Sequence, residues 1–158
     1  MGVQYEVHGA AKFFQRGSTT VRALDGVDLM IEAGEFVALE GPSGSGKTTL
    51  LQLLGALDRP SAGDIVFEGR DLARLPDVQL AALRLRSFGF VFQQFNLIPT
   101  LTAVENVEVK LAPVGGDRAK ALQMLSEVGL ADRDEVAGER DRLGHRAQGR
   151  DRGAVLRR

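Results

Sequence analysis

The sequence of 158 residues predicts an α/β fold, and two observations carry that prediction. Short apolar or alternating runs fill the first third of the chain, a pattern that is typical of strands. Farther along, apolar residues recur at helical spacing, and the first such segment follows a glycine-rich turn. This mixture predicts helices layered on a sheet, with some antiparallel pairing near the N-terminus.

The strand-like segments differ in pattern. Val3–Val7 alternates, and Val21–Ile31 is rich in Val, Leu and Ile with a break at Gly26. Phe36–Leu39 is a short apolar run between two glycines, which predicts a buried strand that enters a turn. The remaining strands are expected at Asp64–Glu68 and Phe88–Phe92.

Helices are expected where apolar spacing meets a start or stop signal. Five leucines predict a helix over Thr48–Leu57, which the Pro- and Gly-containing run 59–63 stops. Thr102 with Glu105 three residues later forms a capping box, so a helix opens near Val104. Two further helices are expected, at Asp77–Arg86 and at Arg118–Val128 before Gly129.

The composition changes at about Ala131. Half of the arginines lie beyond this point, acidic residues are interspersed with them, and few large apolar residues remain. Such a segment buries too little apolar surface to offset the entropy of ordering. We therefore expect a folded domain over residues 1–130 and a poorly ordered Arg-rich tail over residues 131–158.

Charge and residue usage exclude several functions. The formal net charge of −1 gives no general attraction to nucleic acid or to an anionic membrane. The absence of cysteine excludes disulfides and thiol catalysis, and His8 and His145 stand in no metal-ligand spacing. No apolar stretch approaches the roughly 18 residues of a spanning helix. A role at a membrane would therefore need a partner.

The turn before the first helix carries the chemistry. Gly41-Pro42-Ser43-Gly44-Ser45-Gly46-Lys47-Thr48 fits the pattern G-x-x-x-x-G-K-[ST] of a P-loop in full. Its glycines let successive backbone N–H groups point at phosphate oxygens, and the helix that follows adds its positive dipole end. A chance match remains the alternative, but the motif stands between a strand and a helix, as the mechanism requires. The fold class is therefore that of a P-loop NTPase.

Two side chains of the motif have separate tasks. Lys47 supplies a positive charge between the β- and γ-phosphates of a nucleoside triphosphate. The hydroxyl of Thr48 is a hard oxygen ligand of the kind that Mg²⁺ prefers. ATP or GTP with Mg²⁺ would satisfy both. GTPases read guanine with an Asn-Lys-x-Asp element, and neither Asn96 nor Asn106 begins such a run.

From about Tyr5 to Leu130 the chain resembles an ABC transporter ATP-binding domain. The resemblance rests on elements in register: ALDGVDL from Ala23, GPSGSGKTTLLQLLGALDRPSAGDI from Gly41, GFVFQQFNLIP from Gly89 and TAVENV from Thr102. In the last two elements, the sequence is most similar to the lipoprotein-release and macrolide-export branch of the family. The resemblance implies an antiparallel N-terminal β subdomain beside the P-loop sheet, and ATP with Mg²⁺ as ligands.

The resemblance also implies roles for single residues. Phe14 falls where the family stacks an aromatic ring on adenine, although the adjacent Phe13 could exchange roles with it. Val21 would pack beside the same base, and the nucleotide contacts would extend through Thr49. Gln93 matches the glutamine that reaches Mg²⁺ and the attacking water, with Gln94 as the alternative.

Partners follow from the resemblance as well. The region Phe95–Thr102 corresponds to the family's contact with an integral-membrane permease, and local core packing is the alternative use of its apolar residues. The family's ATP-binding subunits are cytoplasmic, are held at the inner face of the cell membrane by the permease, and form homodimers.

Other elements of the family are missing from the sequence. It contains no Ser-Gly-Gly run for the signature loop, and Leu130 is followed by no apolar strand with the catalytic Glu. His145 matches no switch histidine. We therefore expect a C-terminally truncated or frame-disrupted, incomplete domain that stays monomeric and binds ATP far better than it hydrolyses it. The alternative function is a non-hydrolysing nucleotide-binding remnant. Acidic residues among the tail arginines argue against nucleic-acid binding.

Overall fold

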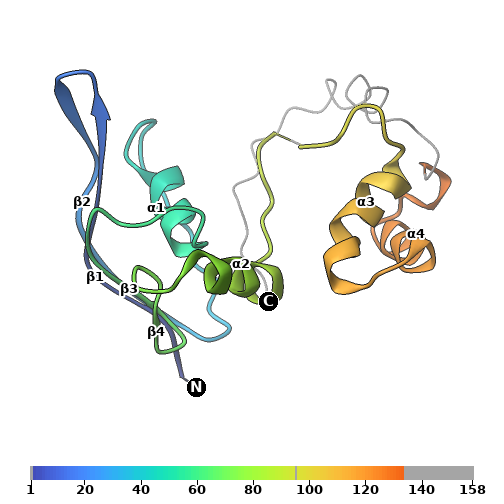
Figure 1. Cartoon of the computed structure of the whole chain (residues 1–158), viewed down its shortest axis with the longest axis horizontal. Coiled ribbons are helices and arrows are strands. Elements are labelled where there is room, and N and C mark those ends of the chain that lie inside the picture. Colours follow the sequence, from blue (N-terminus) through green and yellow to red (C-terminus); the bar gives the residue numbers. More distant parts are fainter. Residues whose placement is uncertain (1, 95, 134–158) are drawn as a thin grey trace. The chain divides into compact units, whose positions relative to one another are not determined.

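The computed structural model describes residues 2–94 and 96–133, and these fall into two compact units. The first unit holds the described residues up to Phe90, and the second holds those from Val91. The two units are treated separately below, and Figure 1 labels their elements.

The first unit contains a four-stranded antiparallel sheet in the order β2-β1-β3-β4. Two long strands, β1 (Val3–Arg16) and β2 (Thr19–Glu32), form a hairpin. The other edge of β1 pairs with β3 (Ala62–Phe67), which in turn pairs with the two-residue β4 (Arg70–Asp71). This sheet confirms the antiparallel β subdomain that the resemblance implies.

The strand β1 extends nine residues past the expected end at Val7. The sequence did not reveal this continuation, because a β-bulge after Val7 interrupts the alternation of side chains. The register shifts between Val7 and Ala10, where the Gly9 amide donates to Asp28 Oδ1 at 2.8 Å. The partner strand β3 crosses the bulge at Gly63. A Cβ atom there would collide with the backbone of His8 and Gly9, so only glycine fits.

The β1–β2 hairpin projects beyond the rest of the sheet. Pairing between β1 and β3 ends at Ala11 and Ala62, whereas pairing between β1 and β2 continues to Arg16 and Thr19. The end of the hairpin is therefore a two-stranded overhang, and Figure 1 shows it rising past β3.

One apolar core joins the sheet to two helices, α1 (Lys47–Leu54) and α2 (Asp77–Ser87). Both helices lie on one side of the sheet in Figure 1. Phe67 lies at the centre, with its ring centroid 4.8 Å from those of Tyr5 and Phe88. The buried hydroxyl of Tyr5 donates to the Leu54 carbonyl at 3.0 Å, which ties β1 to the end of α1.

The second unit contains two helices, α3 (Ala103–Leu111) and α4 (Arg118–Glu127), and the short 3-10 helices η1 (Ala112–Val114) and η2 (Ala131–Arg133). The expected capping box is confirmed. The Thr102 hydroxyl accepts from the Glu105 amide at 3.3 Å, and Glu105 Oε2 accepts from the Thr102 amide at 2.7 Å. Asp117 caps α4 in the same way, by accepting from the Lys120 amide.

Two expected strands are wrong. The runs Phe36–Leu39 and Phe88–Phe92 have no strand assignment, and Phe36 and Val91 are each 72% exposed. Apolar, β-branched composition makes a segment fit for a strand, but a strand also needs a neighbour to complete its ladder. Within the described residues, no segment pairs with either run. Phe88 instead packs its ring on the core beside Phe67 and Phe90.

The four expected helices are present, with ends that differ by up to three residues. The largest difference is at α1, which ends at Leu54. The next residue, Gly55, is packed so closely that a Cβ atom there would collide with the Phe90 ring. The predicted tail from residue 131 lies outside the described residues apart from the 3-10 turn at Ala131–Arg133, so the boundary at residue 130 stays a prediction.

Candidate nucleotide-binding site

The Gly41–Thr48 loop leads into α1, residues 33–40 connect it to the last residue of β2, and the backbone of the loop bends at glycines. Gly44 and Gly46 have φ of +80° and +88°, which side chains other than glycine rarely allow. Pro42, Ser43, Ser45 and Thr48 are exposed, and Thr49 is partly exposed. A turn of this shape, open to solvent, lets a ligand approach the backbone closely.

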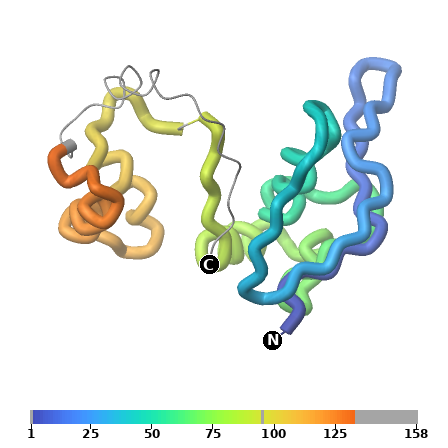
Figure 2. Tube along the Cα trace, turned by 180° about the vertical axis from the view of Figure 1, so that it is seen from behind, coloured from blue at the N-terminus to red at the C-terminus, as the bar shows by residue number. Residues whose placement is uncertain are grey.

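Gly46 fixes the loop against the hairpin. A Cβ atom at this position would collide with the Ala23 carbonyl oxygen and lie 3.0 Å from a methyl group of Leu24, so the loop touches β2 directly. Figures 1 and 2 both show the segment before α1 running beside the hairpin. The Gly41–Thr48 loop and the hairpin are therefore parts of one packed structure.

No side chain of α1 or its N-cap offsets the partial positive charge of the helix dipole at the N-terminus of α1. Gly46 at the N-cap carries no side chain that could cap the helix, and its first turn contains no acidic residue. The first helical bond runs from the Leu50 amide to the Gly46 carbonyl at 2.8 Å. The preceding amides, from Lys47 to Thr49, belong to the group that a helix leaves free for a ligand. An anion such as phosphate suits this end.

Lys47 directs its ammonium group into the loop. Nζ donates to the carbonyl oxygens of Gly41 and Pro42 at 2.8 Å each, and to Ser45 Oγ at 3.3 Å. The positive charge therefore lies at the concave side of the turn, beside the start of α1. The exposed hydroxyl of Thr48 lies one residue farther along. This donor set fits the phosphates of a nucleotide and one oxygen ligand of Mg²⁺.

Phe14 and Val21, expected beside a base, are brought together. They face each other as a cross-strand pair of β1 and β2 on the overhang, and they are 42% and 45% exposed. Val21 is two residues before Ala23, where the loop touches β2. Phe13 is partly buried, and the Arg22 guanidinium lies 5.4 Å from the centre of its ring. Exposure therefore favours Phe14 over Phe13 as a surface for a base.

Gln93 and Gln94 belong to the second unit and are both exposed. They follow the run Phe88–Phe92, which does not form the strand expected before Gln93. Among the described residues, no cluster of three or more His, Cys, Asp or Glu side chains could hold a metal ion. A magnesium site made by Thr48 and Gln93 stays a prediction.

The expected permease-contact region, Phe95–Thr102, is described from Asn96. Ile98 and Pro99 are exposed, whereas Leu97 and Leu101 are partly buried. The side chain that shapes the loop is Asn106.

Asn106, which was not predicted as a site residue, is buried in α3 and holds that loop by four hydrogen bonds. Its Oδ1 accepts from the Ile98 amide at 2.7 Å. Its Nδ2 donates to the carbonyls of Ile98, Leu101 and Thr102 at 2.9–3.2 Å. A polar residue between Val104 and Val107 on a helix was the available signal.

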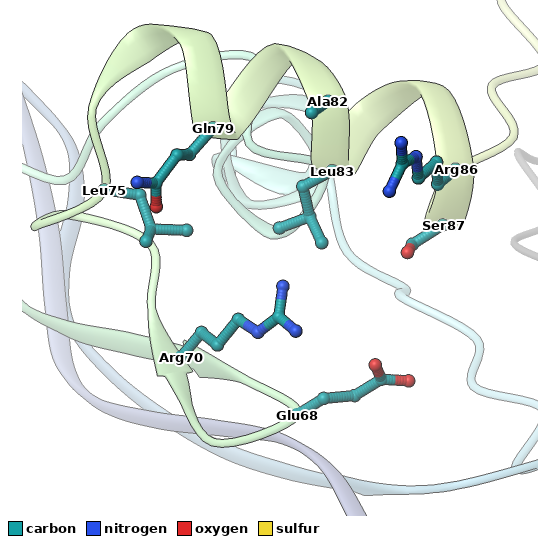
Figure 3. Close-up of a pocket in the computed structure, with 8 residues that line it drawn as sticks. All are labelled: Glu68, Arg70, Leu75, Gln79, Ala82, Leu83, Arg86 and Ser87. Atoms are coloured by element: carbon teal, nitrogen blue, oxygen red, sulfur yellow. The ribbon is translucent and has the colours of Figure 1, made fainter.

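A cavity of about 380 Å³ lies elsewhere in the first unit, between the β3–β4 turn and α2 (Figure 3). It shares no residue with the Gly41–Thr48 loop. Its wall combines the Glu68 carboxylate with the guanidinium groups of Arg70 and Arg86, so its charge favours no single class of ligand. The loop and the Phe14–Val21 pair make the better candidate site. The cavity is lined by Glu68, Arg70, Leu75, Gln79, Ala82, Leu83, Arg86 and Ser87.

A glycine-rich turn packed on a strand, an uncapped helix start, an inward lysine and a nearby exposed ring define a P-loop nucleotide-binding domain. Comparison with known proteins specifies the family. The sequence model described as "ABC transporter" matches residues 24–152. The chain belongs to the ATP-binding family of ABC transporters.

Individual relatives agree with this assignment. The chain is 46% identical over 132 residues to the macrolide export ATP-binding/permease protein MacB of Hyphomonas neptunium, covering 81% of this chain and 20% of MacB. It is also 46% identical over 126 residues to an uncharacterized ABC transporter ATP-binding protein of Thermotoga maritima, covering 77% of this chain and 54% of that protein.

The solved structures show the same fold. The ATP-binding cassette MJ0796, in a dimeric post-hydrolysis state with ADP and Pi, superimposes with a TM-score of 0.78 at 38% identity. The match covers 85% of this chain and 62% of that one. The α/β P-loop fold expected from the sequence is thereby confirmed, and the chain spans about a fifth to three fifths of the proteins it resembles.

None of the helices within residues 2–94 and 96–133 combines the length and the apolar character that a membrane crossing requires.

Proposed function

We propose that this chain binds Mg-ATP as part of an ABC transporter ATP-binding subunit that works with a membrane permease at the cytoplasmic face. One observation carries the proposal. The Gly41–Thr48 loop and the exposed Phe14–Val21 pair lie in the same packed unit, joined where Gly46 touches Ala23. A nucleotide needs both a phosphate cradle and a surface for its base.

The residues divide the binding work. The amides at the start of α1 and the Lys47 ammonium hold the phosphates, and Phe14 offers a ring for adenine. Thr48 would supply an oxygen ligand to Mg²⁺. Gln93 would be a further ligand and would orient the attacking water molecule. The ion, when bound, neutralises charge on the phosphates. These groups bind the nucleotide, whereas positioning a water molecule for attack needs further groups.

The transport partner is the second part of the proposal. The loop 96–102 exposes Ile98 and Pro99, and Asn106 holds its backbone in a defined shape. An apolar loop held in shape and open to solvent is suited to contact with another protein. The MacB relatives carry ATP-binding and permease parts in one protein, so a permease is the partner we propose for this chain.

Hydrolysis by the chain alone is expected to be slow. The sequence has no Ser-Gly-Gly run of the signature loop, and loss of a positioned base typically lowers a rate by 10²–10⁴-fold. Binding energy that is equal for the ground state and the transition state does not accelerate the chemical step. The non-hydrolysing nucleotide-binding remnant is therefore the second candidate function.

Calorimetry with Mg-ATP tests the binding site. Lys47→Ala removes a charged donor to the phosphates, and we expect an affinity about 10- to 100-fold lower, as for loss of a charged hydrogen bond. Lys110→Ala, at an exposed lysine of α3, is the matched control and should bind like the original chain. Equal affinity of the Lys47→Ala variant and the original chain would show that the loop is not the phosphate site.

Phosphate release tests whether the chain alone hydrolyses ATP. Turnover that vanishes in the Lys47→Ala variant would support an active ATPase and contradict the expected slow hydrolysis. ATP-dependent dimers in sizing experiments would contradict the expected monomer. Binding of Mg-ATP by the original chain without phosphate release would agree with the expected slow hydrolysis.

A further inference from the structure

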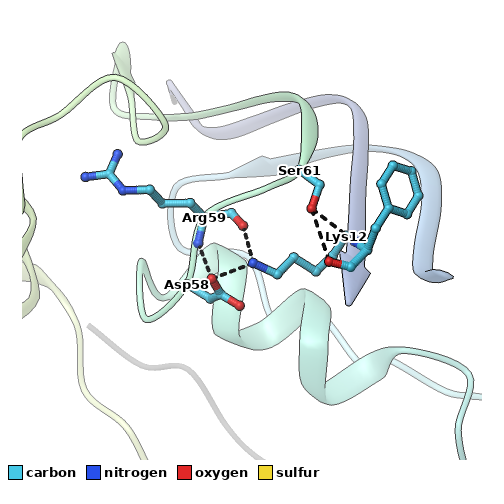
Figure 4. A network of polar contacts seen from close by, with 5 residues as sticks. Lys12, Asp58, Arg59 and Ser61 are labelled. Atoms are coloured by element: carbon cyan, nitrogen blue, oxygen red, sulfur yellow. Dashed lines mark hydrogen bonds and ion pairs between the residues drawn. The ribbon is translucent and has the colours of Figure 1, made fainter. Parts of the chain in front are cut away.

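We propose that Lys12 and Asp58 are positioning residues for the nucleotide base, because together they fasten Phe14 and its overhang to the end of the P-loop helix. This inference rests on the proposed ATP-binding function and assigns a role to two residues outside the P-loop motif. Figure 4 shows the network that contains them.

The ammonium group of Lys12 is held at three points. Nζ lies 2.6 Å from Asp58 Oδ1, donates to the Arg59 carbonyl at 2.7 Å, and lies 5.3 Å from the centre of the Phe14 ring. Lys12 and Phe14 are two residues apart in β1, so both side chains stand on the same side of the strand. The Lys12 side chain is only 13% exposed. A charge held this tightly sets the position of the ring beside it.

The location of this contact gives it importance. Pairing of β1 with β3 ends at Ala11, so Phe14 and Val21 lie on a part of the hairpin that no third strand from residues 2–94 or 96–133 supports. The Lys12 ion pair begins one residue beyond that end. Ser61 adds to it, because its Oγ accepts from the Phe13 amide at 3.0 Å. Where the overhang leaves the sheet, these side-chain contacts take the place of the backbone hydrogen bonds that a third strand would make.

Asp58 connects this point to the phosphate end of the site. It follows α1 by four residues, and its amide and that of Leu57 donate to the Gln52 carbonyl within the helix. Oδ1 of Asp58 also accepts from the Arg59 amide at 2.7 Å, which fixes the carboxylate. The helix that begins at Lys47 thus ends near the Lys12–Asp58 ion pair beside Phe14. One rigid element therefore sets the spacing between phosphates and base.

The neighbouring ring supplies a matched control. Arg22 lies 5.4 Å from the centre of the Phe13 ring, much as Lys12 lies over Phe14. Arg22 and its partner Asp25 are both more than 60% exposed, and the pair joins residues within β2 rather than β1 to α1. Removing the Arg22 charge therefore removes a similar cation–ring contact without releasing the overhang.

The experiment measures Mg-ATP and tripolyphosphate affinities by calorimetry for the original chain and three variants. Lys12→Met keeps most of the length of the side chain but loses its charge, and we expect ATP binding to weaken about 3- to 30-fold with tripolyphosphate binding unchanged. Lys12→Arg should restore most of the ATP affinity. Arg22→Met should bind both ligands like the original chain.

A fourth variant guards against the charge that Lys12→Met leaves unpaired. Lys12→Met with Asp58→Asn removes both charges, and we expect the same selective loss of ATP affinity. In a Phe14→Ala background, adding Lys12→Met should cause no further loss, because the ring through which Lys12 acts is gone.

The outcomes separate this proposal from the function on which it rests. If the original chain binds neither ligand, the proposed function fails. If Phe14→Ala selectively weakens ATP binding while Lys12→Met and the double variant leave it unchanged, only the positioning role fails. Equal weakening of ATP and tripolyphosphate by Lys12→Met and by the double variant would also overturn it, since that result indicates a general loss of structure.

Discussion

Each of the two units is stabilised internally by a different kind of interaction. Among the described residues, the main cluster of the first unit joins fourteen buried apolar residues, most of them from its strands and helices. The cluster of the second unit contains three, Val104, Ala121 and Leu125. The second unit compensates with polar contacts between side chain and backbone, chiefly those of Asn106 and the Thr102–Glu105 capping box.

This difference predicts where each unit is sensitive. Apolar burial contributes roughly 25 cal/mol per Å², so a large cluster loses most when a buried ring is removed. A small cluster loses most when a buried polar group loses its partners, because an unsatisfied group costs about 1–3 kcal/mol. The predictions below test this comparison, beginning with the largest effect.

Phe67→Ala should have the largest effect. The ring is 2% exposed and touches the rings of Tyr5 and Phe88, so its removal should cost about 3–5 kcal/mol of unfolding free energy. Urea denaturation followed by tyrosine fluorescence measures it, since Tyr5 is the only tyrosine and the chain has no tryptophan. Phe36→Ala, at an exposed ring, is the control and should change stability little. Similar losses for the two variants would show that the cluster does not dominate.

Asn106→Ala should have a smaller effect that is confined to the second unit. It leaves the Ile98 amide and the Leu101 carbonyl without their partner and removes one of two donors to the Ile98 and Thr102 carbonyls, at a cost of about 1–3 kcal/mol. Hydrogen exchange should become faster in peptides covering residues 96–111 and stay unchanged in those covering β1 and β3. Val109→Ala, at an exposed position of the same helix, provides the comparison. Unchanged exchange in the loop would contradict the role given to Asn106.

The smallest effects concern pH, and the two units should respond at opposite ends of the scale. Burial, with the Glu68 charge adding to it, raises the pKa of Tyr5 well above 10. This contribution to stability is present below about pH 10 and is lost as the pH rises through the folded pKa. Hydrogen bonds from the Thr102 amide and hydroxyl lower the pKa of Glu105. That contribution is present above about pH 4.3 and is lost as the pH falls through the folded pKa.

Direct titration checks both directions. Tyrosinate absorbance should rise only well above pH 10, and a carboxyl NMR signal of Glu105 should titrate below its ordinary range. Tyr5→Phe should remove most of the alkaline dependence, and Glu105→Gln should reduce the acid dependence of the second unit. Ordinary titration by both groups would remove the pH contrast between the units.

Features that depend on consecutive residues could be predicted from the sequence. The Gly41–Thr48 loop, the capping box and the four helices all arise from local patterns, and each is present. Phe14 and Val21 face each other near the turn of the β1–β2 hairpin, although the sequence pattern indicated no strand at Phe14. Only the resemblance to ABC transporters pointed to these two residues.

Features that depend on distant neighbours could not be predicted. The composition of Phe36–Leu39 indicates a strand, but a pattern within the run cannot show whether another strand lies beside it. Asn106 and Lys12 acquire their importance from carbonyls and a carboxylate elsewhere in the chain. Such partners become visible only in three dimensions.

The overhang of the β1–β2 hairpin has a consequence for the entropy of binding. A two-stranded ribbon is marginally stable, and a segment with few buried contacts fluctuates more than the sheet from which it projects. A base that stacks on Phe14 would restrict those fluctuations, so part of the interaction would be offset by lost conformational entropy. Lys12 and Asp58 reduce that entropy loss, because they order the ribbon where it leaves the sheet before a nucleotide binds. The affinity for ATP would thus depend on how much order the free protein already has.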